Sequence, residues 1–105
     1  YGYGASGRAN TILQYCNLNK DDIPYIIDDS KAKHGFYTPG SHIKICSADI
    51  LVSNKKPDYI LLFAWSFLKE IAIKNKRYLE QGGKIILPLP KVRIIRLNDV
   101  KNFFK

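Results

Sequence analysis

The sequence has no methionine, only two cysteines and no long apolar run, and each shortage narrows what the chain can be. The longest apolar stretch, residues 59–68, is interrupted by Ser66 and is far shorter than the ~20 residues that a membrane-spanning helix needs. No basic segment followed by an apolar one opens the chain, so a secretory signal is not indicated. We therefore expect a cytoplasmic protein with no membrane partner. Because the chain lacks Met and begins at Tyr1, we expect it to be a fragment of a longer protein.

The two cysteines, Cys16 and Cys46, are too few for a structural zinc site, which takes four ligands. No histidine stands at ligand spacing beside either of them, so we assign no metal ligand to this chain. Each cysteine follows an aromatic or aliphatic residue. This pattern predicts buried, reduced thiols, as in a cytosolic protein.

The charge of the chain is unevenly distributed. A chain of 105 residues is long enough for one domain, and its net charge is +8. All of this net charge lies in residues 55–105, because basic and acidic residues balance in residues 1–54. A basic half can bind nucleic acid, but its lysines are not interleaved with aromatic residues or glycines as in strand-binding motifs. We interpret it as a solvated surface, and keep nucleic-acid binding or a purely structural role as a less favoured alternative.

Apolar segments with strand-like and helix-like periods alternate along the chain, which indicates an α/β fold. Residues 59–65 form an almost unbroken apolar run, typical of a strand covered on both faces in a parallel sheet. Ser66 is predicted to cap a single helix over residues 67–81, whose inner face carries Phe67, Ile71 and Tyr78. We expect a Rossmann-like three-layer sandwich with a mostly parallel sheet, the first strand being largely missing at the N-terminus. The other predicted elements are a helix over residues 8–16 and strands over residues 24–27, 42–46, 84–87 and 92–97.

A glycine motif opens the chain. Gly2, Gly4 and Gly7 match G-x-G-x-x-G, in which glycines allow a close backbone approach to a phosphate and a helix N-terminus supplies free amides. Asp28 follows at about the 20-residue spacing of the acid in this motif. At the end of the second predicted strand it can accept hydrogen bonds from ribose hydroxyls. The alternative is a glycine turn that only packs the first helix against the sheet.

The irregular segment 29–41 is a second candidate site, the alternative being an ordinary surface loop. It leaves the carboxyl end of a predicted strand, where open α/β sheets bind ligands, and long irregular loops in small domains tend to be functional. Its Lys33 and Thr38 suit phosphate and sugar contacts, whereas His34 has no visible carboxylate to orient it as a general base. Trp65, where the strand over residues 59–65 meets its helix, is either a core residue or a stacking partner for a base or sugar.

Five ordered segments resemble the C-terminal domain of the S-adenosylmethionine-dependent nucleotide-sugar C-methyltransferases, enzymes of deoxysugar biosynthesis. The resemblance covers residues 1–92, so residues 93–105 are expected to form a basic C-terminal extension. The segments are residues 2–16 (GYGASGRANTILQYC), 26–33 (IIDDSKAK), 37–43 (YTPGSHI), 57–65 (PDYILLFAW) and 79–90 (LEQGGKIILPLP).

The resemblance implies a protein of three parts: a zinc-binding N-terminal module, a methyltransferase domain that holds S-adenosylmethionine, and this Rossmann-like domain. The nucleotide-sugar would lie between the last two. The catalytic base and the methyl donor would lie outside this chain, which would bind no cofactor directly and would be inactive alone. The implied role is substrate binding by residues that match family positions, namely Gly4, Ala5, Ser6, Thr11, Lys33, Thr38, Pro39, Gly40, His42 and Trp65. The glycine motif adds Asp28 to this set.

The chemistry of the residues points to a class of ligand rather than to one ligand. Amides at the start of a helix favour a diphosphate, which dinucleotides and nucleotide-sugars both carry. A stand-alone dinucleotide-binding Rossmann module is therefore the main alternative. The family resemblance favours the nucleotide-sugar.

Overall fold

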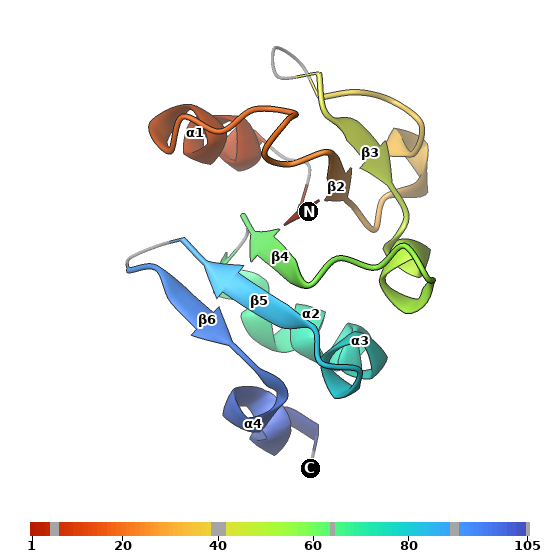
Figure 1. Cartoon of the computed structure of the whole chain (residues 1–105), viewed down its shortest axis with the longest axis vertical. Coiled ribbons are helices and arrows are strands. Elements are labelled where there is room, and N and C mark those ends of the chain that lie inside the picture. Colours follow the sequence, from red (N-terminus) through yellow and green to blue (C-terminus); the bar gives the residue numbers. More distant parts are fainter. Residues whose placement is uncertain (5–6, 39–41, 64, 89–90, 105) are drawn as a thin grey trace.

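The computed structural model describes residues 1–4, 7–38, 42–63, 65–88 and 91–104. Its centre is a six-stranded sheet with the strand order β3-β2-β1-β4-β5-β6 (Figure 1). All neighbouring strands are parallel except β5 and β6. The strands are β1 Gly2–Tyr3, β2 Tyr25–Ile27, β3 Lys44–Cys46, β4 Tyr59–Leu62, β5 Lys84–Leu87 and β6 Arg93–Ile95. This order confirms the predicted Rossmann-like α/β fold with a mostly parallel sheet, and the first strand has only two residues.

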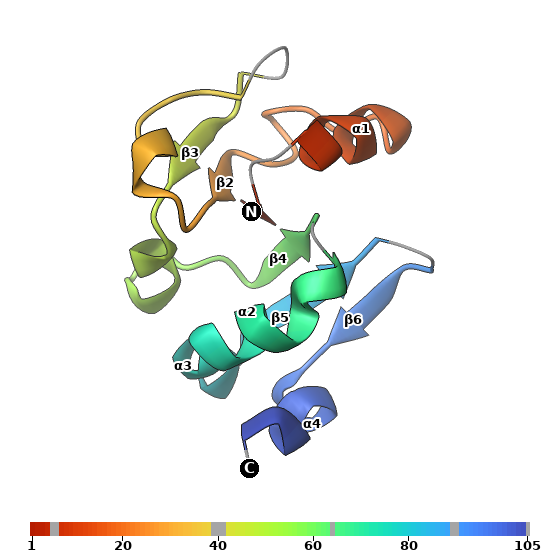
Figure 2. The same ribbon diagram turned by 180° about the vertical axis from the view of Figure 1, so that it is seen from behind.

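Helices lie on both faces of the sheet. Helix α1 (Gly7–Tyr15) covers one face, and helices α2 (Leu68–Lys74) and α3 (Lys76–Glu80) cover the other (Figures 1 and 2). A 3₁₀ turn at Ala48–Val52 lies in the crossover from β3 to β4, and helix α4 (Leu97–Val100) follows β6. No helix in the described part of the chain is long and apolar enough to cross a membrane.

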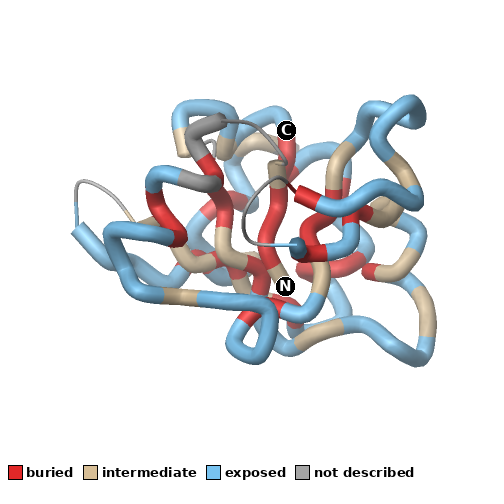
Figure 3. Tube along the Cα trace, turned by 90° about the horizontal axis from the view of Figure 1, so that it is seen from above, coloured by how far each residue is buried: buried red, intermediate tan, exposed pale blue. Residues whose placement is uncertain are grey.

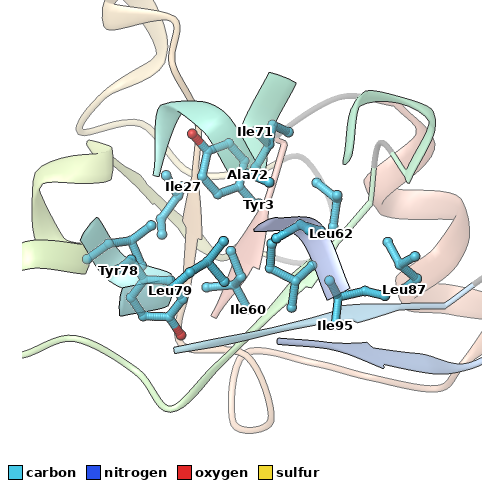
Figure 4. Close-up of a cluster of buried hydrophobic side chains, with 13 residues drawn as sticks. Tyr3, Ile27, Ile60, Leu62, Ile71, Ala72, Tyr78, Leu79, Leu87 and Ile95 are labelled. Atoms are coloured by element: carbon cyan, nitrogen blue, oxygen red, sulfur yellow. The ribbon is translucent and has the colours of Figure 1, made fainter. Parts of the chain in front are cut away.

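Two apolar cores lie on the two sides of the sheet, because strand residues alternate between its faces. In β2, Ile26 packs with Ile12 and Leu13 of α1, whereas Ile27 packs on the α2 side. The larger core joins α2 and α3 to β4, β5 and β6 (Figure 4). The buried residues gather in the interior of the molecule, with exposed segments around them (Figure 3). Val100 belongs to the larger core, and Phe103 packs against it, so the residues after β6 are attached to the same core.

The single helix predicted over residues 67–81 is wrong, because the chain breaks between α2 and α3 at Asn75. The Asn75 side chain donates to the Ile71 carbonyl at 2.9 Å and to the Tyr3 hydroxyl at 3.2 Å. The amide is thereby bound to the sheet, and its backbone leaves the helical conformation, with φ −113° and ψ 33°. The predicted Ser66 cap is also wrong, because a 3₁₀ turn at Trp65–Phe67 precedes α2 and Phe67 occupies the cap position.

Two predicted burials are corrected by the structure. Phe67 is exposed rather than on the inner face of its helix, because the 3₁₀ turn places it before α2 begins. Cys16 is exposed because it follows the last residue of α1 and turns away from the core; Cys46 is partly buried. Both thiols are free. The other predicted ranges agree with observed elements to within a few residues, and residues 84–87 match β5 at both ends.

Gly2 shows how closely the central strand is packed. A Cβ atom at this position would overlap the ring of Phe63 and lie 3.2 Å from Cγ1 of Ile26. The first glycine of the motif is therefore required by packing under α1. For Gly2, the structure therefore supports the alternative that the glycine motif serves to pack the first helix against the sheet.

Candidate functional site

At the carboxyl end of the sheet, the connections that follow β1 and β4 lead to opposite faces. The chain leaves β1 towards α1 on one face, and it leaves β4 towards α2 on the other. Ligands of open α/β sheets bind at such a point, because the two connections diverge and leave a crevice. Gly4 lies there with a φ of 101°, a conformation that residues with a side chain rarely adopt. Its amide donates to the Ile27 carbonyl at 2.7 Å, which fixes the turn to the end of β2.

A pocket of about 300 Å³ opens at this edge. It combines a backbone turn, two neighbouring carboxylates and part of α2, and is lined by Tyr3, Gly4, Asp28, Asp29, Phe67, Glu70, Ile71 and Lys74. Of the residues predicted from the sequence, Gly4 and Asp28 lie in its wall. The predicted pair from the glycine motif and the second strand is thus brought together across β1 and β2.

A hydrogen-bonded network forms one side of the pocket. The Tyr3 hydroxyl donates to the Asp29 carboxylate at 2.9 Å, and Lys74 Nζ lies 3.2 Å from Asp29 Oδ2. The Asn75 amide donates to the same hydroxyl from the buried side. Burial raises the pKa of Tyr3 well above its usual range, and the neighbouring Asp29 charge acts in the same direction. The hydroxyl therefore stays protonated and holds Asp29 in place.

Asp28 has different partners from Asp29. Its Oδ1 accepts from the Ser30 amide at 2.8 Å, and its Oδ2 lies 3.8 Å from Lys33 Nζ. Lys33 is therefore placed beside the pocket by an ion pair with a residue of its wall. His34 Nε2 lies 2.6 Å from the Asp28 carbonyl, which can only accept, so this nitrogen carries the proton. His34 is thus a structural donor in this arrangement, not a general base at Nε2.

The segment after Asp29 is more ordered than the irregular loop predicted from the sequence. Phe36 and Thr38 make backbone hydrogen bonds with Ile45 and Ile43, so residues 35–38 run beside β3. Thr38 is buried, and its Oγ1 accepts from the Ile43 amide at 2.9 Å. His42 is exposed, with a φ of 53°, and its amide donates to the Thr38 carbonyl. Thr38 and His42 therefore shape a turn.

The remaining predicted residues are dispersed. Thr11 lies on α1 and lines a different pocket, of about 420 Å³, together with Cys16 and Val92. Trp65 is partly buried after the end of β4 and packs against both cores. Ala5, Ser6, Pro39 and Gly40 lie outside the described residues.

Sequence reasoning missed the residues on the α2 side of the pocket, chiefly Tyr3, Asp29 and Lys74. A signal for Asp29 was present. Tyr3 and Ile27 are paired in register and both belong to the core under α2. Asp29 stands two residues after Ile27, and strand periodicity directs it to the same face. Lys74 carried no comparable signal, because its approach to Asp29 depends on how α2 packs.

The chain is similar to known proteins in sequence and in fold. The family model described as "C-methyltransferase C-terminal domain" matches residues 1–90. C-methyltransferase NovU from Streptomyces niveus is 38% identical over 94 residues, which make up 90% of this chain and 22% of that protein. The chain thus spans about a fifth of the length of this relative. UDP-D-quinovosamine 4-dehydrogenase from Vibrio fischeri shares the fold, with a TM-score of 0.57 and 15% identity over 94% of this chain and 93% of that one. The chain belongs to the family of C-methyltransferase C-terminal domains.

Proposed function

We propose that this chain is the nucleotide-sugar-binding C-terminal domain of an S-adenosylmethionine-dependent sugar C-methyltransferase. The observation that carries the proposal is the pocket at the carboxyl ends of β1 and β2, where the Gly4 turn meets Asp28. A pocket at this point of an open α/β sheet suits a nucleotide. Membership of a C-methyltransferase family supplies the class of reaction.

In this proposal the ligand lies across the sheet edge with its diphosphate beside the Gly4 turn and the start of α1. Free amides and the partial positive charge of a helix start favour an anion. Asp28 accepts hydrogen bonds from sugar hydroxyls, and Lys33 balances charge beside it. Trp65 contributes an aromatic surface. The other proposed contacts are Ala5, Ser6, Thr11, Thr38, Pro39, Gly40 and His42.

The proposed reaction begins with removal of a proton from the carbon next to a keto group of the sugar, which leaves an enolate-like nucleophile. S-adenosylmethionine supplies the methyl group that this carbon takes up. The base and the methyl donor belong to another domain of the polypeptide, so this chain alone binds and orients the substrate without turnover. Holding the nucleophilic carbon in line with the methyl group lowers the activation free energy of methyl transfer, because both reactants are then fixed in one reactive geometry.

The proposal includes the rest of the protein as expected from the sequence. A methyltransferase domain and a zinc-binding module precede this domain in a cytoplasmic polypeptide. Residues 1–92 form the family domain, and residues 93–105 are an extension that adds β6 to the sheet edge and α4 to the core. The basic charge of the second half is a solvated surface rather than a nucleic-acid site.

The test uses the full-length protein, S-adenosylmethionine and a panel of keto-deoxysugar nucleotides. We expect methyl transfer that depends on the sugar nucleotide. In Asp28→Asn, the KM for the sugar nucleotide should rise by about tenfold for one lost charged hydrogen bond, while kcat changes little. Asp21→Asn is the matched control, because Asp21 is exposed and lies outside the pocket. Absence of turnover across the panel would contradict the proposal.

A binding experiment separates the main alternative. The protein is titrated with NAD and with dTDP, which share a diphosphate. Saturable binding of the thymidine nucleotide that Asp28→Asn weakens supports the proposed function. Saturable binding of NAD, with no binding of dTDP, would favour a dinucleotide-binding module.

A further inference from the structure

One half of one sheet face carries a continuous apolar surface. Leu61 of β4 pairs with Ile86 of β5, and Ile86 pairs with Ile94 of β6, so the three side chains form one row across three strands. Tyr59 and Lys84 are paired in register beside this row. The intervening residues face the opposite, α2-side core. We call the surface formed by Tyr59, Leu61, Ile86, Val92 and Ile94 the open face.

Three of the five residues of the open face are exposed although they are apolar, whereas Leu61 and Ile86 are partly buried. Tyr59 is 41% exposed, Ile94 42% and Val92 75%. Helix α1 covers the β2 and β1 part of this side, and among the helices of the described chain none lies over β5 and β6 there (Figure 1). The other side of the same strands is buried under α2 and α3. The sequence predicts a strand over residues 59–65 that is covered on both faces. In the described part of the chain, no helix covers the open-face side of the neighbouring strands β5 and β6.

Hollows flank the open face. The one beside α1 is the pocket of about 420 Å³ lined by Thr11, Cys16 and Val92 among others. A second, of about 230 Å³, is lined by Tyr1, Leu18, Ile23, Tyr59, Leu61 and Ile86 among others. The two hollows lie along the α1 side of the open face. Apolar surface with hollows along its border is the shape that an amphipathic helix or strand fills.

We propose that the open face binds a segment of the same polypeptide that precedes Tyr1 in the full-length protein. This inference rests on the proposed function, in which the chain is the last domain of a longer enzyme. The relative at 38% identity is long enough to hold such a segment, since the matched region is 22% of it. Tyr1, the residue to which such a segment would be joined, lies beside the open face. Its amino group is 3.2 Å from the Tyr59 carbonyl and Tyr1 lines the second hollow, while its ring packs against the α2-side core, so polypeptide arriving at Tyr1 begins beside this face.

Charge argues against a second copy of the chain as the occupant. Lys84 lies on the face itself, with Nζ 5.2 Å from the centre of the Tyr59 ring. Two copies meeting at this face would each bring a Lys84 ammonium group into the contact, which is unfavourable where water is excluded. The segment should instead present apolar residues to the face and acidic residues to Lys84.

The first experiment uses Cys16, which is exposed here and lies in the hollow beside Val92. The native full-length protein is pulsed with a thiol reagent, and labelling is read by mass spectrometry in the tryptic peptide 9–20. Glu80→Cys on α3, an exposed position on the opposite side, is the control in peptide 78–84. We expect Cys16 to react at least ~10-fold more slowly than the control, because a covered thiol reacts only through local opening. Equal rates would overturn the proposal.

The second experiment compares two isoleucines of similar exposure on opposite sides. Ile94 is 42% exposed on the open face, and Ile73 is 45% exposed on α2. In the full-length protein, Ile94→Glu should lower the melting temperature and speed labelling of Cys16, whereas Ile73→Glu should leave the labelling rate unchanged. Equal effects of the two substitutions on labelling would overturn the proposal, and protection lost on dilution would assign the face to a second copy.

These outcomes are separable from the proposed function. A protected Cys16 in a protein without methyl transfer would support the covered face and contradict the proposed reaction. A freely reactive Cys16 in a protein with full methyl transfer would overturn only the covered face.

Discussion

Alkaline pH is expected to destabilise the folded chain through Tyr78. This side chain is 1% exposed, and its hydroxyl donates to the Pro57 carbonyl at 2.9 Å. Burial raises the pKa of Tyr78 to about 12. In an unfolded chain, tyrosine titrates near 10. The folded and unfolded states therefore hold this proton with different strength.

The direction of the effect follows from where the proton is lost first. Between pH 10 and pH 12 the unfolded chain loses the Tyr78 proton while the folded chain keeps it, so the free energy of unfolding falls as the pH rises. The contribution is full below pH 10 and is lost by about pH 12. The difference between the two pKa values corresponds to roughly 3 kcal/mol at most. Tyr3, whose pKa burial also raises, acts in the same direction.

The assay is urea unfolding followed by circular dichroism, at a series of pH values between 8 and 12, for the original chain and for Tyr78→Phe. The variant keeps the ring and loses the hydroxyl, so at pH 8 it should be less stable by about 1 kcal/mol. Above pH 10 it should lose less stability than the original, so the two curves should approach each other and cross before pH 12. Tyr15→Phe is the control, because Tyr15 is 85% exposed. Parallel curves for the original and for Tyr78→Phe would refute the reasoning.

Three further substitutions test the packing and the network. Gly83→Ala places a Cβ atom against the ring of Tyr78 and should lower the unfolding free energy by about 1–3 kcal/mol in urea unfolding. Tyr3→Phe removes the hydroxyl that holds Asp29, and a double-mutant cycle with Asp29→Asn should give a coupling of about 1 kcal/mol, whereas additive effects would contradict the network. Thr38→Val removes the acceptor of a buried amide five residues later and should cost about 1–3 kcal/mol, measured by thermal unfolding; an unchanged melting temperature would show that this turn tolerates the loss.

The fold was predictable because local signals agreed with it. Gly82 and Gly83 precede β5 and Pro88 follows it, so both ends of the strand were evident from turn residues. The cap at Ser47 is equally local, because its side chain accepts from the amide of Asp49, two residues later. The mostly parallel sheet followed from the alternation of strand-like and helix-like segments, whereas the order of the strands comes from the structure. The family resemblance was confirmed by the match over residues 1–90.

The parts that sequence reasoning missed depend on contacts between distant residues. The break at Asn75 comes from a hydrogen bond to Tyr3, 72 positions away, which no local pattern shows. Cys16 was predicted to be buried from its apolar neighbour, but burial depends on whether anything covers the end of α1. At the candidate site, Gly4 and Asp28 were visible as a spaced motif, whereas Lys74 reaches the pocket only through the packing of α2.

The short length of β1, which has only two residues, affects how the protein unfolds. Among the residues that the structure describes, these two are the only strand residues that join the β2–β3 half of the sheet to the β4–β6 half, and they bond to both neighbours. The first strand of the sequence is thus a two-residue connection between two parts of the sheet that follow it in the sequence. If the sheet separates at β1, we expect β2 and β3 to detach together with α1 before the larger core unfolds. Amide protons of β2 and β3 should therefore exchange with solvent sooner than those of β4 and β5, and a ligand bridging Gly4 and Asp28 would slow that exchange.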